Sequence, residues 1–326
     1  MPQISETIYA PELERGQWIQ HGPVGLKALR GKAVVLVDFW DYTCVNCIRT
    51  LPYVAGWHRR YADRGLVVVG VHAPEFSFAR EGSHVAEAAK RFGLEYPIVL
   101  DNEYAIWRAY SNRCWPAKYL VDSKGRIRYY HFGEGSYQES EVAIQTALRE
   151  LNPTASLPPP IEPMRDMDRP GVVCYRVTPE LYLGHARGQF GNPEGVTRDR
   201  PHDYRDIGPH VEGMTYLAGR WRVESEAAIA EIAGAAISLR YTAKDVNLVM
   251  APPADASVRV EIKVEGSQKP GEDVKFEGNR GLVTVDRPRM YSLVANDSVV
   301  SGSIVLRAEQ AGLSVYAFTF ISCAVA

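Results

Sequence analysis

The chain has 326 residues, 46% of them hydrophobic and 23% charged, which is typical of a globular protein with one large or two medium domains. A net charge of −2 provides no basic surface, so nucleic acid and anionic lipid are excluded as expected partners. No apolar run is long enough to form a transmembrane segment, and five cysteines are too few for a disulfide scaffold.

The first 18 residues carry acidic side chains where a secretory signal would need an apolar core. We therefore expect a cytoplasmic protein, or a periplasmic or otherwise extracytoplasmic one if an upstream segment is missing.

Buried strands alternate with helices in the first half of the chain. The apolar run 33–40 predicts a strand covered on both faces, and apolar residues three or four positions apart predict a helix at 44–64. The other expected elements are strands at 66–73 and 96–101, helices at 82–92, 103–110 and 137–151, and a hairpin at 118–132. This order predicts an α/β domain over residues 1–152.

Residues 153–170 hold six of the 21 prolines and are expected to form an extended, Pro-rich linker. In the second domain, 171–326, the segment Val258–Val264 alternates strictly between apolar and polar residues, as a half-exposed strand does. Turn residues separate the other expected strands, so the pattern predicts an all-β sandwich or jelly roll. These strands are expected at 237–243, 246–252, 281–286, 290–296, 303–309 and 313–322.

The chemistry is expected at Cys44 and Cys47, which follow the first buried strand and open the predicted helix. At a helix N-terminus, free backbone N–H groups and the helix dipole favour the thiolate, so Cys44 is expected to be the attacking sulfur. Cys47, one turn further along and more buried, would resolve the mixed disulfide. A zinc site is the alternative interpretation, but the sequence has no second CxxC or HxxxH to complete it.

Asp38 and the Trp115-Pro116 dipeptide also fit redox chemistry. Asp38 lies six residues before Cys44 in the apolar strand. A carboxyl group desolvated there should have a raised pKa and could shuttle the proton of Cys47, whereas its alternative role is a surface charge at a strand end. Trp115 and Pro116 precede a predicted strand, and a cis bond there would free the preceding backbone to pair with an extended substrate.

The run VDFWDYTCVNC, the following Pro52 and the late Trp115-Pro116 resemble the thioredoxin fold, closest to its TlpA- and DipZ-type branch. Residues 115–137 resemble the soluble C-terminal region of DipZ-type cytochrome c biogenesis proteins. The resemblance continues through 178–184, 289–294 and 315–320, and it implies that the second domain is a carbohydrate-binding-module-like β-sandwich.

Carried over residue by residue, the resemblance implies that Cys44 is the nucleophile and Cys47 the resolving cysteine. It also implies that Asp38 is the buried acid, Trp40 the active-site aromatic residue and Pro116 the cis-proline. Neither a metal nor a cofactor is expected beyond a redox-active Cys44–Cys47 disulfide.

The remaining cysteines are open to more than one interpretation. Cys114, two residues before Pro116, could be a third redox cysteine, part of the substrate groove together with Trp115, or a semi-buried free thiol. Cys174 and Cys323 could be adjacent in space and are expected to be free thiols in a reducing compartment.

The sequence thus predicts a thiol:disulfide oxidoreductase, in the reductase direction, with protein disulfide or dithiol clients and an unidentified electron donor. One alternative is a peroxiredoxin-like thiol peroxidase, although Thr43 is wrongly spaced from Cys44 for the PxxxTxxC motif. Another is a module that binds a carbohydrate or protein ligand and carries an accessory redox domain. Its binding aromatics would come from a set of five: Tyr182, Phe190, Tyr204, Tyr216 and Trp221.

A polar loop at 184–213 contains His185, His202 and His210. Its length is compatible with a functional loop, but the histidine spacing matches no known metal-binding pattern.

Overall fold

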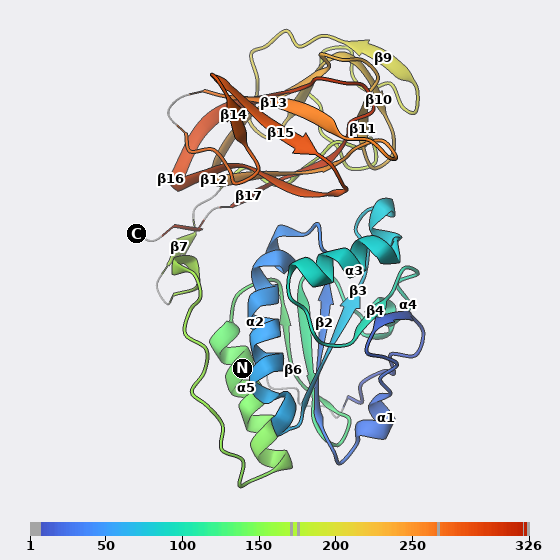
Figure 1. Cartoon of the computed structure of the whole chain (residues 1–326), viewed down its shortest axis with the longest axis vertical. Helices are drawn as coiled ribbons and strands as arrows, with labels where there is room; N and C mark the ends of the chain where they lie inside the picture. Colours follow the sequence, from blue (N-terminus) through green and yellow to red (C-terminus); the bar gives the residue numbers. More distant parts are fainter. Residues whose placement is uncertain (1–7, 170–171, 175–176, 266–267, 322, 325–326) are drawn as a thin grey trace. The chain divides into compact units, whose positions relative to one another are not determined.

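The computed structural model describes residues 8–169, 172–174, 177–265, 268–321 and 323–324 (Figure 1). Two compact units meet in sequence between Met164 and Arg165. The first seven residues of the segment searched for a signal, Pro170 and Gly171 at the predicted domain boundary, and Ser322 of the last predicted strand lie outside the described residues.

A six-stranded mixed sheet forms the centre of the first unit, with strand order β1-β4-β3-β2-β5-β6. Strands β2, β3 and β4 are parallel to one another, whereas β1, β5 and β6 are antiparallel to their neighbours. The strands are β1 (Gln17–Gln20), β2 (Val34–Trp40), β3 (Leu66–His72), β4 (Ile98–Leu100), β5 (Ala117–Val121) and β6 (Ile127–Phe132).

Helices cover both faces of this sheet because its central strands are apolar on both sides. On β2, Leu36 and Trp40 pack with α2 and α5 in one core, while Val37 and Phe39 belong to the core of the opposite face. The predicted thioredoxin-like α/β domain is therefore confirmed. The helices are α1 (Leu26–Leu29), α2 (Val45–Tyr61), α3 (Gly82–Arg91), α4 (Ala105–Ala109) and α5 (Tyr137–Leu151), with short 3₁₀ turns at Ala62–Arg64, Ser77–Arg80 and, in the second unit, Asp166–Asp168.

The first part of the Pro-rich segment packs against the first unit, and Asp166–Asp168 forms a 3₁₀ turn. We call residues 156–164 the strap. The backbone N–H of Ile161 donates to the buried Glu141 carboxylate of α5 at 2.8 Å, and the N–H of Met164 donates to the hydroxyl of Tyr53 in α2 at 2.6 Å. The strap thus connects the two helices that cover the α2 face of the sheet.

The second unit is all-β and encloses one large apolar core, consistent with the predicted sandwich. Its main sheet has the order β14-β15-β13-β16-β12-β10-β11-β17-β8, with β9 paired to β10 and β12 also paired to β17. The strands are β7 (Val173–Cys174), β8 (Leu181–Tyr182), β9 (Pro201–Tyr204), β10 (Thr215–Val223), β11 (Ala228–Ala230), β12 (Ala236–Ala251), β13 (Val258–Val264), β14 (Lys275–Glu277), β15 (Arg280–Val285), β16 (Arg289–Ala308), β17 (Ser314–Ile321) and β18 (Cys323–Ala324).

The predicted division of two strands was wrong. The runs 237–243 and 246–252 form the single strand β12, and the runs 290–296 and 303–309 form β16. The residues predicted to form turns lie at a bulge instead. There the ladder between β12 and β16 passes from the pair Ala243↔Val300 to the pair Asp245↔Ala295, and then it continues.

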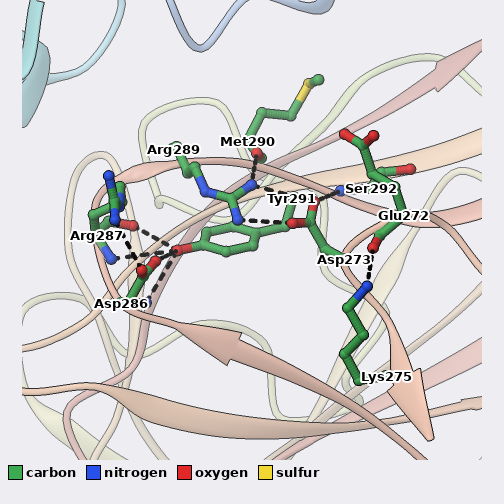
Figure 2. Close-up of polar contacts among 9 residues, drawn as sticks. All are labelled: Glu272, Asp273, Lys275, Asp286, Arg287, Arg289, Met290, Tyr291 and Ser292. Carbon is green, nitrogen blue, oxygen red and sulfur yellow. Dashed lines mark hydrogen bonds and ion pairs between the residues drawn. The ribbon is translucent and has the colours of Figure 1, made fainter. Parts of the chain in front are cut away.

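The start of β16 is held by the polar cluster drawn in Figure 2. The Arg289 guanidinium donates to both carboxylate oxygens of Asp273, at 2.7 and 3.2 Å, and lies 3.7 Å from the centre of the Tyr291 ring. The Tyr291 hydroxyl donates to the carbonyl oxygen of Arg287 at 2.8 Å. These contacts join the start of β16 to Asp273 and Arg287 within the same unit.

Candidate active site

Cys44 occupies the N-cap of α2, directly after the loop that leaves the carboxyl end of β2. The backbone N–H of Cys47 donates to the sulfur of Cys44 at 3.3 Å, so the side chain satisfies one of the free N–H groups of the first helical turn. Cys44 is half-buried, Cys47 is fully buried, and both are free thiols in the structure. The pair therefore combines one accessible and one enclosed sulfur.

The environment of Cys47 disfavours its thiolate. Burial raises the pKa of Cys47 well above its ordinary value, and the hydrogen bond and charge of Cys44 raise it further. A base is therefore required to remove this proton before the sulfur can react.

Asp38 lies on the sheet face that α2 covers and is completely buried. Neither carboxylate oxygen has a hydrogen-bond partner among the described residues. Burial raises the pKa of Asp38 to about 7, even though the charge of Lys118 lowers it. The carboxyl group can therefore hold or release a proton near neutral pH.

Gly70 of β3 leaves room for two ring systems beside Asp38, its neighbour across the parallel ladder. A Cβ atom at Gly70 would lie 3.0 Å from the indole nitrogen of Trp40 and 3.0 Å from the Tyr96 ring. The indole N–H of Trp40 and the hydroxyl of Tyr96 are buried and have no hydrogen-bond partner among the described residues. Burial raises the pKa of Tyr96 well above its ordinary value, and the charges of Asp38 and Cys47 add to this effect.

The loop before Cys44 is fixed by a second buried carboxylate, Asp41, which the sequence analysis missed. Asp41 accepts hydrogen bonds from the backbone N–H and the hydroxyl of Thr43, at 2.6 and 2.5 Å, and from the backbone N–H of Glu75 at 2.8 Å. The Asp-Tyr-Thr spacing is the local signal for such a turn. Burial raises the pKa of Asp41, although these hydrogen bonds oppose the shift.

His72 is the buried neighbour of Asp41, with 3.7 Å between its Nε2 atom and the nearer carboxylate oxygen. Burial lowers the pKa of His72 to about 3, so its imidazole is neutral near physiological pH. The ring stacks on Tyr42, with 5.7 Å between the ring centres, and so supports the same loop.

The Trp115–Pro116 segment, whose peptide bond is cis, precedes β5. The Trp115 indole donates to the carbonyl of Ala73 at 3.0 Å and packs on Trp107, with 4.5 Å between the ring centres. Cys114 is half-buried, with its sulfur 3.9 Å from the Pro116 carbonyl oxygen. Burial raises the pKa of Cys114, and the charge of Cys44 adds to this effect.

Arg49 and Glu134 form an ion pair beside this site that the sequence did not indicate. The Arg49 Nε atom donates to Glu134 at 2.8 Å, and a second nitrogen of the guanidinium donates to Asn46 at 2.8 Å. The pair connects the first turns of α2 to the loop that follows β6.

The aromatic residues predicted to bind a ligand in the second unit are buried or half-buried. Three of the five candidate aromatics, Tyr204, Tyr216 and Trp221, are buried in the core, and Tyr182 and Phe190 are half-buried. Cys174 and Cys323 are opposite residues of the short β7–β18 ladder.

Within the described residues, no three His, Cys, Asp or Glu side chains gather as metal ligands would, and none of the helices has the length and apolar character needed to cross a membrane.

Comparison with known families matches both units. Residues 20–145 match the family described as Redoxin, and residues 178–320 match the family described as Thioredoxin like C-terminal domain.

Among individual proteins, the chain is 36% identical over 300 residues to Protein DipZ of Mycobacterium bovis and of Mycobacterium tuberculosis. The alignment covers 91% of this chain and 40% of DipZ, so the chain spans less than half the length of these relatives.

The first unit is also 29% identical over 140 residues to the thiol-disulfide oxidoreductase YkuV of Bacillus subtilis, covering 43% of this chain and 94% of YkuV. A solved thioredoxin-like protein in its oxidized form is 29% identical, with a TM-score of 0.41, and the match covers 44% of this chain and 97% of that one.

Proposed function

Because this chain is a homologue of DipZ and of thiol-disulfide oxidoreductases, and has a thioredoxin-like domain, we propose that it reduces disulfides of protein clients through Cys44 and Cys47. The observation that carries the proposal is the half-exposed Cys44 at the start of α2, with the buried Cys47 one turn behind it.

The proposed exchange has two steps. In the first, the Cys44 thiolate attacks one sulfur of a client disulfide, and the other client sulfur leaves as a thiolate and takes up a proton. In the second, Cys47 gives its proton to the Asp38 carboxylate and attacks the sulfur of Cys44. The second client sulfur leaves Cys44 as a thiolate and takes up a proton, so the client is reduced by two electrons, and Cys44 and Cys47 are joined as a disulfide.

An external dithiol must then return two electrons and two protons to the oxidised pair. The reacting groups are otherwise side chains of this chain alone, so the proposal needs no bound metal or organic cofactor. The reductase direction is supported by the absence, in the sequence between the two cysteines, of a histidine that would stabilise the dithiol form.

The test is reduction of insulin, with dithiothreitol as the electron source. Cys44→Ser should abolish the activity, whereas Cys174→Ser, a matched control that removes a cysteine of the second unit, should retain it. Cys47→Ser should accumulate mixed disulfides, and mass spectrometry of the adducts would identify clients. Undiminished insulin reduction by Cys44→Ser would disprove the proposal.

A further inference from the structure

Lys118 is a fully buried lysine that is not among the residues assigned above to the exchange reaction. It lies in β5 directly across the antiparallel ladder from Asp38 of β2. Directly opposite residues in such a ladder project from the same face of the sheet. The ammonium and the carboxyl therefore share the sheet face on which Cys47 lies.

The alternation of neighbouring residues identifies that face. Leu36 and Leu120, two residues from Asp38 and Lys118 along their strands, belong to the core formed with α2 and α5. Cys47 belongs to the same core. The pair thus lies on the sheet face whose core includes Cys47, in the first turn of α2.

Neither Lys118 nor Asp38 makes a short hydrogen bond to a neutral group among the described residues. The Lys118 nitrogen donates one long hydrogen bond, 3.4 Å, to the carbonyl oxygen of Gly133 and lies 5.7 Å from the centre of the Tyr137 ring. Asp38 accepts no hydrogen bond from the described residues. Because an isolated buried charge is costly, each group is more easily ionised when the other is charged.

The other titratable groups around the pair do not supply a competing cation. Tyr96 feels the charges of both Asp38 and Cys47, and Cys47 feels those of Cys44 and Asp41, and none of these groups carries a positive charge. Around Lys118 lie Cys47, Cys114 and Glu134. His131 is also close, but burial lowers its pKa, which favours the neutral ring. Within the described residues, Lys118 is therefore the group whose positive charge acts on Asp38, although burial lowers the pKa of Lys118 itself.

We propose that Lys118 is a positioning residue that sets the pH range in which Asp38 accepts the proton of Cys47. The inference rests on the proposed function, since it concerns the second step of that exchange. The ammonium stabilises the Asp38 carboxylate before the proton transfer and never contacts the client. The sulfur–sulfur exchange itself is unchanged.

The direction of the effect follows from the charges. The positive charge of Lys118 lowers the pKa of Asp38, against the larger opposing effect of burial. An apolar side chain at position 118 removes the lowering effect, so Asp38 would keep its proton to higher pH and accept the Cys47 proton only there. An opposite charge at close range shifts a carboxyl pKa by about one to three units.

The experiment uses the full chain and dithiobisnitrobenzoate, an aromatic disulfide that releases a coloured thiolate at each step. Attack by Cys44 releases the first thiolate, and attack by Cys47 releases the second. Stopped-flow absorbance between about pH 5 and 10 gives the pH profile of the second release for wild type, Lys118→Met and Lys118→Arg. Lys124→Met, in the exposed turn of the same hairpin, is the matched control.

We expect Lys118→Met to move the midpoint of the second release upward by about one pH unit or more. Lys118→Arg, which keeps the charge, and Lys124→Met should stay near the wild-type midpoint. If Lys118→Met and wild type share one midpoint, the proposal is overturned. Should Lys118→Met fail to fold, Lys118→Gln provides the same comparison with a polar, uncharged side chain.

A second measurement is independent of catalysis. Titration of the Asp38 carboxyl carbon by NMR, in the protein oxidised at Cys44 and Cys47, should show the same upward shift in Lys118→Met. If wild type releases no second thiolate but the NMR shift is present, the proposed function fails and the coupling stands. If exchange is normal and the NMR midpoint does not move, the role of Lys118 fails alone.

Discussion

Replacing Asp38 by Asn should stabilise the first unit at alkaline pH while impairing exchange. Burial raises the pKa of Asp38 from its ordinary value of 3.8 to about 7. Between these values the folded state keeps a proton that the unfolded state has released, so the free energy of unfolding falls as the pH rises. Over an interval of about three units, at about 1.36 kcal/mol for each, the loss amounts to about 4 kcal/mol above pH 7.

Urea unfolding of reduced wild type and Asp38→Asn at several pH values would measure this cost. The two proteins should be about equally stable near pH 4, where both carry a neutral side chain at position 38. Near pH 8.5 the variant should be more stable by about 2–4 kcal/mol. The lower figure includes the destabilisation that arises when the Lys118 ammonium loses its counter-charge. The double variant Asp38→Asn/Lys118→Met should regain the stability lost in this way.

Asp63→Asn, at an exposed carboxylate of the same unit, is the control for the substitution itself. A difference in unfolding free energy between wild type and Asp38→Asn that stays constant from pH 4 to 8.5 would refute the reasoning. A variant that is less stable than wild type at every pH would refute it too.

Three other substitutions test the surrounding structure. Glu141→Leu leaves two buried donors and one partly buried donor without their acceptor. At about 1–3 kcal/mol each, this should lower the urea midpoint of the first unit severely, whereas Glu141→Gln should lower it less. Asp41→Asn weakens the hydrogen bonds that fix the turn before Cys44, each of which contributes about 1 kcal/mol. The variant should therefore slow the first thiolate release in stopped-flow assays. Arg289→Met leaves the Asp273 carboxylate without its guanidinium and should lower the thermal midpoint of the second unit, at a cost of about 1–3 kcal/mol, while insulin reduction is unchanged.

The parts of the site that could be predicted from sequence are local. Asp38, Cys44 and Cys47 lie on one strand–loop–helix unit, so their order along the chain already fixes their approximate arrangement. Likewise, apolar runs and three- or four-residue spacing predicted the main strands and helices of the first unit, because burial on one or both faces leaves a periodic pattern. The short, partly polar β1 and α1 carry too little of this pattern and were not predicted.

The parts that escaped prediction depend on pairing between distant segments. Lys118 belongs to a predicted hairpin, where a lysine normally indicates the solvent side of a strand, and only the register with β2 places it beside Asp38. From the sequence, Gly70 would be expected only to weaken its strand. In the structure, the absence of a side chain at Gly70 leaves room for Trp40 and Tyr96. In the second unit, the residue types at a bulge in a long strand are the same as those in a turn between two short strands. The sequence therefore could not distinguish the two in β12 and β16.

The stability and the kinetics of the first unit are linked through the proton on Asp38. Stability stops falling with pH where the folded protein loses that proton, and the second thiolate release rises where the same carboxylate appears. Lys118→Met must therefore move both midpoints upward by a similar amount. If the kinetic midpoint moved alone, Lys118 would act on the thiol of Cys47 rather than on Asp38. If the stability midpoint moved alone, Asp38 would be a buried charge that takes no part in resolving the mixed disulfide.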